Sequence, residues 1–286
     1  MIEDIQTLTG VSLRRICRVL KLPRSSYYQQ LAPSSSRIRD RKLGELITRV
    51  FKDNQRRYGY RRIHSELGDQ GMACSAARVR RLMKERGLRA LTARKFVPVT
   101  SDGKANQPSP NQLLDQPVPN APGKVWVGDI TYIPTRRGWR YLAVVMDLCS
   151  RKIIGWSLAD NLRSGLVCDA LKQAITTRRR HHEIVFHSDQ GSQYGSRAFR
   201  QVLHQFSFKQ SMSRRANPYD NAWTESFMGT LKLECVNPSS FQDENDARKQ
   251  LFNYIDGYYN TRRKHSSLGY LSPTKFESLI HQKLRA

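Results

Sequence analysis

The chain has 286 residues, 38% of them apolar, so it is long enough to form two or three domains with at least one buried core. Its 49 Lys and Arg residues against 24 Asp and Glu give a formal net charge of +25 at pH 7. This excess is outside the usual balance of a metabolic enzyme and predicts a polyanionic partner.

The five cysteines are scattered and form no C-x-x-C pair, which argues against a disulfide framework and a structural zinc site. The first ten residues are acidic where a signal peptide is basic. The longest apolar run, 141–146, is far too short to span a bilayer. We therefore expect a soluble intracellular protein in a reducing compartment, with no membrane partner.

Two helical pairs are expected before residue 100. The first covers residues 11–31 and is broken at Pro23, and the second covers 58–87, turns at Gly71 and restarts at Ser75. Each pair has the layout of a helix-turn-helix, and the whole region is expected to be helical.

The last of these helices is expected to present a basic face. Arg78, Arg81 and Lys84 lie together on it, partly opposite an apolar stripe. A basic face that is merely solvated is the alternative. Because residues 1–100 carry 23 basic and 8 acidic side chains, a net +15, we favour DNA recognition by this helix.

The segment 101–123 is expected to be an extended linker. It has little periodic apolar pattern and contains five of the 12 prolines, Pro108, Pro110, Pro117, Pro119 and Pro122. The expected organisation is therefore a helical DNA-binding region over 1–100, a linker over 101–123 and a core domain with a C-terminal helical extension over 124–286.

Beyond the linker the apolar pattern changes to alternation. The expected elements are strands over 124–133, 141–148 and 153–158, a helix over 164–178, a strand over 184–187, a helix over 196–206, a strand over 209–212, a helix from about 219 and a helical stretch over 243–259. The first three strands form an antiparallel meander, and the helical crossover makes the fourth parallel. This order predicts an α/β fold of the ribonuclease H-like class, with a five-stranded mixed sheet, flanking helices and an all-α helix-turn-helix region before it.

Three carboxylates occupy meaningful places in this order. Asp129 lies within the first strand, Asp189 follows the fourth, and Glu225 lies in the helix after the fifth. Three clustered carboxylates repel one another unless a cation joins them, and their hard oxygens suit Mg²⁺ or Mn²⁺. Two such ions about 4 Å apart would promote in-line attack of water or a 3′-hydroxyl on a DNA phosphodiester.

Other polar residues near these acids are weighed against structural roles. Asn221 and Lys232 share the helix face of Glu225, so Asn221 is a candidate for orienting the carboxylate or substrate and Lys232 for contacting a phosphate, with a surface salt bridge as the alternative. Glu234 lies about 180° round the helix and is expected to be solvated.

Two further polar residues and one loop are also considered. Asp147 on the second strand is expected to be structural, and His187 is more often a structural hydrogen-bonding group than a base at such a position. The loop 191–194, which includes Tyr194, is a weaker candidate for positioning the substrate strand or stacking on a base.

Several strings together resemble one family. They are Gly128–Ile133, His187–Tyr194, Asn217–Phe227, Tyr259-Asn260, His265–Pro273 and Tyr58–Ile63. The chain resembles bacterial insertion-sequence transposases with a retroviral integrase-type core. Within them it is similar to the downstream (OrfB-type) product of the group encoded in two overlapping reading frames. Asp189 and Glu225 have the family spacing of 35 residues, and Lys232 matches its basic residue. Lys264 stands where the family usually has proline.

The resemblance implies a DNA transposase that cuts a 3′ end of its element and joins the hydroxyl to another phosphodiester. It also implies Asp129, Asp189 and Glu225 as the acid triad, terminal repeats and target DNA as partners, and a homo-oligomer on DNA. An upstream-frame (OrfA-type) partner or fusion and a cytoplasmic, nucleoid-associated location in bacteria follow from the same resemblance. A non-catalytic DNA-binding regulator and a ribonuclease H-type nuclease acting on RNA–DNA hybrids are the alternatives.

Overall fold

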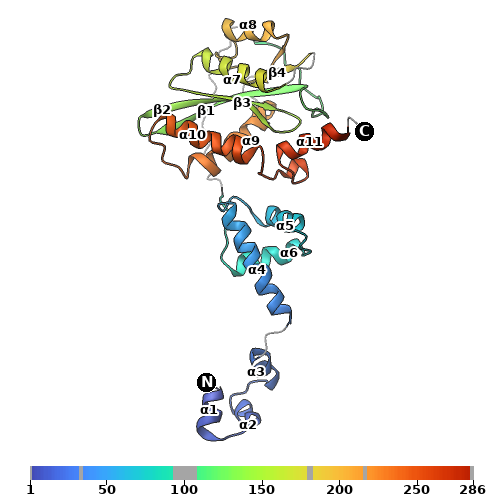
Figure 1. The fold of residues 1–286 in the computed structure, drawn as a ribbon, viewed down its shortest axis with the longest axis vertical. Helices are drawn as coiled ribbons and strands as arrows, with labels where there is room; N and C mark the ends of the chain where they lie inside the picture. Colours follow the sequence, from blue (N-terminus) through green and yellow to red (C-terminus); the bar gives the residue numbers. More distant parts are fainter. Residues whose placement is uncertain (1, 32–34, 93–107, 179–182, 215–217, 284–286) are drawn as a thin grey trace. The chain divides into compact units, whose positions relative to one another are not determined.

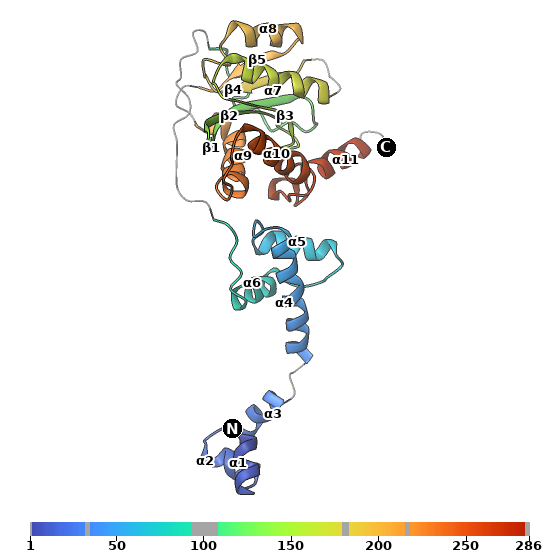
Figure 2. The ribbon, with the colours of Figure 1, turned by 60° about the vertical axis from the view of Figure 1, so that its left-hand side comes forward.

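The computed structural model describes residues 2–31, 35–92, 108–178, 183–214 and 218–283. The chain divides into two compact units, Met1–Ala90 and Leu91–Ala286 (Figures 1 and 2). No helix in these ranges is both long enough and apolar enough to cross a bilayer.

The first unit is helical. It contains α1 (Ile2–Thr9), α2 (Leu13–Val19), α3 (Arg24–Leu31), α4 (Ser35–Asp53), α5 (Tyr60–Asp69) and α6 (Ala76–Glu85). Both expected helical pairs are present as α2 with α3 and α5 with α6. Ser75 caps α6, its side chain accepting the backbone N–H of Arg78 at 3.2 Å. Gly71 has a φ of +76°, which suits glycine at the predicted turn.

The long helix α4 has no counterpart in the expected elements. It packs on α5 and α6, and its buried residues are Leu43, Gly44, Ile47, Val50 and Phe51. Their spacing of three and four residues gives one apolar stripe, which was the sequence signal for this helix. Because α4 supplies one wall of the small core, the second helical pair is completed by a third helix.

The second unit is built on a five-stranded sheet. Its strands are β1 (Val125–Thr135), β2 (Gly138–Asp147), β3 (Ile153–Ala159), β4 (Val185–Ser188) and β5 (Lys209–Met212), in the order β3-β2-β1-β4-β5. The first three strands pair antiparallel, and β4 pairs parallel to both β1 and β5. The expected mixed sheet and the ribonuclease H-like order of elements are confirmed.

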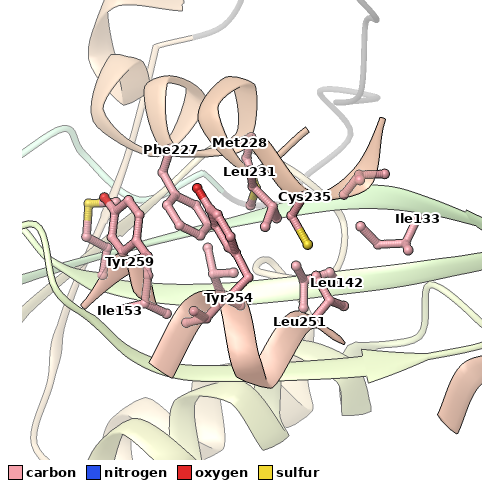
Figure 3. Close-up of a cluster of buried hydrophobic side chains, with 14 of the residues drawn as sticks. Ile133, Leu142, Ile153, Phe227, Met228, Leu231, Cys235, Leu251, Tyr254 and Tyr259 are labelled. Atoms are coloured by element: carbon pink, nitrogen blue, oxygen red, sulfur yellow. The ribbon is translucent and has the colours of Figure 1, made fainter. Parts of the chain in front are cut away.

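Helices cover both faces of this sheet (Figure 1). One face packs on α7 (Ser164–Thr177) and α8 (Arg197–Gln205), and the other on α9 (Ala222–Leu231) and α10 (Glu244–Tyr254). Figure 3 shows the apolar cluster between the sheet and α9 with α10. In it, Phe227, Met228 and Leu231 from α9 lie together with Leu142 from β2. Alternation along β1 directs odd-numbered side chains toward this cluster.

The polypeptide after α9 follows wider turns. The segments η2 (Lys232–Val236) and η3 (Ile255–Tyr259) are π-helical and continue α9 and α10. A short 3₁₀ turn, η4 (Ser266–Leu268), precedes α11 (Pro273–Lys283), a helix that was not expected from the sequence. Glu277 attaches α11 to the core through ion pairs with Lys152, at 3.3 Å, and with Arg178.

The prediction that Glu234 is solvated is wrong. Its side chain is buried and forms an ion pair with Arg263, whose Nε and Nη2 donate to the carboxylate at 2.8–3.1 Å. Tyr254 Oη donates a further hydrogen bond at 3.0 Å. The π-helical turn changes the angle per residue, so the α-helical projection that placed Glu234 in solvent does not apply.

Part of the segment expected as a linker lies along the core. Residues 101–107 are outside the described residues, whereas the residues from 108 onward contact β5 and the start of η1 (Pro218–Asn221). Gln112 N–H donates to Ser211 Oγ at 2.9 Å, and Asn111 Nδ2 donates to Asp220 at 3.0 Å.

Candidate active site

The parallel pairing of β1 and β4 places Asp129 and Asp189 at the same level of the sheet. Val127 is the partner of His187, and each acid lies two residues farther along its own chain. Asp129 is therefore within β1, while Asp189 follows the last residue of β4. The Oδ1 atom of Asp189 accepts the N–H of Gly191 at 3.0 Å. The carboxyl ends of parallel strands are a common position for a site in such sheets.

The third acid comes from α9, which packs against β1. Thr224, Phe227 and Met228 bury one side of this helix in the core. Glu225 lies on the exposed side and influences the charge of Asp129. The elements therefore bring the three sequence-predicted acids into one electrostatic cluster.

The negative charges of Asp189 and Glu225 disfavour the ionised form of Asp129. Burial, together with the charges of Asp189 and Glu225, raises the pKa of Asp129 to about 8. Burial also raises the pKa of Glu225. Within the described ranges, neither Asp129 nor Glu225 forms an ion pair with a basic side chain. Lys232 and the backbone N–H of Ile130 favour the charged form of Asp129.

The three acids are near one another without forming a closed metal cage. Among the residues that the structure describes, no three His, Cys, Asp or Glu side chains are arranged closely enough to hold a metal ion. Glu225 is exposed, so its rotamers are less restricted by packing than those of a buried ligand.

Asn221 and Lys232 lie on either side of Glu225 along the same helical segment. Asn221 is the N-terminal cap residue of α9 and is only 5% exposed, yet no donor in the described part of the chain reaches its Oδ1 atom. An unsatisfied buried acceptor costs about 1–3 kcal/mol, so this atom suits a bound cation or donor. Lys232 is half-buried, and burial lowers its pKa while Asp129 opposes that shift.

Residues behind the acids support the fold. A Cβ atom on Gly128 would lie 2.6 Å from Phe186 Cζ, so only glycine fits beside Asp129. Tyr194 is buried and packs on Phe186 and Phe199. Tyr194 therefore cannot be the residue of the loop 191–194 that stacks on a base, because its ring is part of the core, whereas positioning of the substrate strand by this loop stays a prediction.

His187 and Asp147 have structural partners, as expected. His187 is fully buried, its Nδ1 bonded to Ser211 Oγ at 2.8 Å and its Nε2 to the carbonyl of Asp220 at 2.9 Å. Burial lowers the pKa of His187 to about 4. The Oδ1 atom of Asp147 accepts two backbone N–H groups at 3.1 Å, and its Oδ2 accepts that of Gly123 at 2.6 Å.

The basic residues predicted to contact DNA lie on α6. Asp40 on α4 pairs with Arg78 at 2.5 Å and with Arg81 at 2.6 Å, while Lys84 is exposed. Hydrogen bonds from Arg81 and Arg78 hold the pKa of Asp40 below its ordinary value. The structure thus brings Arg78 and Arg81 together on one carboxylate and leaves Lys84 facing water.

Models of known protein families match most of the chain. One described as an HTH-like domain matches residues 38–96, which include most of α4 and all of α5 and α6. Two described as Integrase core domains match residues 119–218 and 207–273. The first match begins before the second helical pair and so includes the helix that was missed.

Full-length similarities agree with these matches. The transposase for insertion sequence element IS904 of Lactococcus lactis is 42% identical over 86% of this chain and 97% of that protein. Transposase InsF for insertion sequence IS3A of Escherichia coli is 38% identical over 93% of this chain and 94% of that protein. Among solved structures, the HTLV-2 integrase catalytic core domain in complex with magnesium has a TM-score of 0.41 at 19% identity, over 55% of this chain and 97% of that chain.

Proposed function

Because the chain belongs to the IS3 family of insertion-sequence transposases, we propose that it cuts the 3′ ends of its element and joins them to target DNA. The family makes it a DNA transposase and a polynucleotidyl transferase with an HTH-like DNA-binding domain. The finer proposal is that Asp129, Asp189 and Glu225 are its catalytic acids. The mutual opposition of their charges is the observation that carries it.

The donor set fits divalent ions. Carboxylate oxygens are the ligands preferred by Mg²⁺ and Mn²⁺, and the unsatisfied Oδ1 of Asn221 supplies one more oxygen beside them. Asp129, Asp189 and Glu225 would hold the ions, about two in number by analogy with two-metal phosphoryl transfer. When bound, they supply Lewis-acid activation of the attacking oxygen and neutralise charge on the phosphate.

The reaction has two displacements at phosphorus. In the first, a bond forms between a water oxygen and phosphorus while the bond to the 3′ oxygen breaks, which frees a 3′-hydroxyl. In the second, that hydroxyl attacks a target phosphodiester and the target's own 3′ oxygen leaves. Lys232 contacts the scissile phosphate, and Asn221 orients the Glu225 carboxylate or the substrate. No covalent bond to the protein is needed.

Recognition of the element's ends is proposed for the first unit. Lys84 faces water on α6, and Arg78 and Arg81 lie beside it on Asp40, from which DNA would release them. Each bidentate base contact is worth about 1–3 kcal/mol of discrimination. Phosphate contacts add affinity without choice and weaken as salt rises.

The remaining partners are part of the same proposal. Two element ends must be cut and joined together, which calls for more than one copy of the chain on DNA. An upstream-frame partner or fusion is the other expected component, in the bacterial cytoplasm at the nucleoid.

A cleavage and joining assay tests the function. The purified chain is incubated with labelled duplexes of its own element's ends and Mg²⁺, and the free 3′-hydroxyl and joined products are measured. Asp189→Asn and Glu225→Gln should each reduce both products to background while DNA affinity is unchanged, because an amide keeps the shape but binds the metal poorly. Near wild-type cleavage by either variant would show that the residue is not a catalytic acid. If the chain is a non-catalytic regulator, the wild type itself gives no products.

A further inference from the structure

An aromatic and basic hairpin extends past the level of the catalytic acids. We define the aromatic hairpin as residues 132–141, where β1 turns into β2. Val127 is the last residue of β1 paired with β4, whereas β1 continues to Thr135 with β2 as its partner. At about 3.3 Å per residue, Thr135 lies roughly 20 Å along the strand from Asp129. That length is less than one helical turn of DNA, which is about 34 Å.

Three aromatic rings gather on one side of this hairpin. The pairing of Tyr132 with Tyr141 and of Pro134 with Trp139 places these side chains on the same face. The Tyr132 ring meets Trp139 edge-on, with centroids 6.3 Å apart and an interplanar angle of 88°, and meets Tyr141 at 5.2 Å. Trp139 is nevertheless 58% exposed, so much of its indole faces water. Unlike a singly exposed ring, this indole belongs to a group of three aromatic side chains, a grouping that is common where a surface binds a ligand.

The hairpin is held in one shape at its tip. Gly138 has a φ of +102°, and its carbonyl accepts a hydrogen bond from Thr135 Oγ1 at 2.7 Å. The N–H of Arg136 donates to the carbonyl of Phe241 at 2.9 Å, which ties the turn to the segment before α10. The exposed indole is therefore presented by an ordered backbone, and little further ordering opposes binding.

Two arginines of the turn add positive charge beside the rings. Arg136 and Arg137 are exposed, and no acidic side chain in the described ranges pairs with either. Arg140 differs, because its Nε is 3.0 Å from Glu244. A flat ring with cations beside it matches a nucleotide, whose base stacks on the ring while its phosphate meets a guanidinium.

We propose that the aromatic hairpin, whose rings lie on the face of the sheet opposite to the Asp129 side chain and whose tip lies about 20 Å along β1 from it, is a binding site for an unpaired DNA base. Trp139 stacks on the base, and Arg136 and Arg137 contact the flanking phosphates. The proposal rests on the proposed function for the nature of the substrate, and it adds a stacking site that the catalytic acids do not require. The net charge of +25 favours DNA over an acid-poor protein surface as the occupant.

Fluorescence of the full-length protein with two DNA probes in EDTA tests this proposal. One probe is a blunt duplex of the element's end, and the other carries a short single-stranded thymidine extension that contains one 2-aminopurine. The wild type should quench the 2-aminopurine by stacking. Trp139→Ala should lose the quenching and bind the extended probe about 5- to 100-fold more weakly, with unchanged affinity for the blunt duplex.

Matched variants separate stacking from general effects. Trp139→Phe keeps a ring and should keep most of the affinity. Phe252→Ala is the control, because Phe252 on α10 is 57% exposed and should behave as wild type when truncated. Circular dichroism of each variant checks that the fold is unchanged.

The other results would overturn the proposal. If Trp139→Ala binds both probes as the wild type does, the hairpin is not a DNA site, and a changed oligomeric state in that variant would make it a protein interface. If it loses both probes equally, the ring does not select unpaired bases. Asp189→Asn should quench the 2-aminopurine as the wild type does, because stacking in EDTA requires neither a metal ion nor cleavage. Cleavage retained by Asp189→Asn in Mg²⁺ would refute the proposed catalytic acid without altering the stacking result.

Discussion

Two acidic side chains of the core domain, Glu234 and Asp129, differ in whether a basic side chain pairs with them. Glu234 is buried, yet Arg263 and Tyr254 satisfy its carboxylate. Burial opposes the charge of Arg263, but the hydrogen bonds and charge of Glu234 outweigh it and raise the pKa of the guanidinium. Asp129 has no such partner in the described part of the chain, and burial and its acidic neighbours raise its pKa instead.

The contrast separates an acid with a structural partner from the acids proposed to be catalytic. Bringing a charge out of water is costly unless it is paired, so a folding domain gains nothing from an acid like Asp129. The pair Glu234–Arg263 joins the end of the helix that carries Glu225 and Lys232 to the C-terminal segments. The unfavourable burial of Asp129 beside other acids is a property that the proposed catalytic role would explain.

The largest expected difference between the two groups is in activity. Asp129→Asn should reduce cleavage to background while its thermal midpoint stays at or above that of the wild type, because the change removes a buried repulsion. Thermal unfolding by circular dichroism and cleavage of labelled element ends measure the two effects. A cleaving Asp129→Asn variant, or one that unfolds much earlier, would place Asp129 with the structural acids.

Removal of the paired acid should act mainly on stability. Glu234→Gln leaves the Arg263 guanidinium buried without its countercharge, which should lower the free energy of unfolding by about 3–5 kcal/mol in urea titrations. Glu45→Gln is the control, since Glu45 and its partner Arg41 are largely exposed and such a pair contributes about 0.3–0.5 kcal/mol. Equal losses for the two variants would contradict the structural role of the buried pair.

A smaller effect is expected for the cation beside the acids. Lys232→Ala should reduce cleavage less than the triad variants do and should also weaken binding of the element's end, because a phosphate contact is lost. Kinetics at several DNA concentrations separate the two effects. Lys232→Arg should recover part of the binding, and wild-type kinetics for Lys232→Ala would return Lys232 to a surface role.

The smallest effect belongs to a half-buried paired acid in the first unit, Asp40. Arg81 and Arg78 hold the pKa of Asp40 below its ordinary value of 3.8, so these pairs stabilise the unit above that pH and are lost as pH falls through the lowered pKa. Asp40→Asn should therefore unfold slightly earlier than wild type near neutral pH and coincide with it in strong acid. A difference that is constant over the whole range would exclude ionisation of Asp40 as its cause.

The sheet and the placement of the acids could be predicted because they depend on local patterns. Alternating apolar residues define β1, and the helical crossover before β4 predicts a parallel strand, which in the structure lies beside β1 and so brings Asp189 next to Asp129. The helix α4 was missed although Leu43, Ile47 and Val50 give it an apolar stripe. Its signal was present in the sequence but was not used.

Other features depend on contacts between distant residues. The burial of Glu234 requires both a π-helical turn and Arg263, which is 29 residues away. The packing of Asn111 and Gln112 on the core is likewise made by side chains about a hundred residues apart. Neither the burial of Glu234 nor this packing could be predicted from the apolar periodicity of the sequence, because a local pattern carries no information on which distant polar groups come into contact after folding.

Counting bound Mn²⁺ on the full-length protein tests most directly whether Asp129, Asp189 and Glu225 form a metal site. Electron paramagnetic resonance of free Mn²⁺ gives the number bound per chain, and about two are expected for the wild type and for Glu45→Gln. The double variant Asp129→Asn, Asp189→Asn should leave the added Mn²⁺ free over the same range. The same binding by this double variant would place the ions elsewhere and contradict the assignment of these acids.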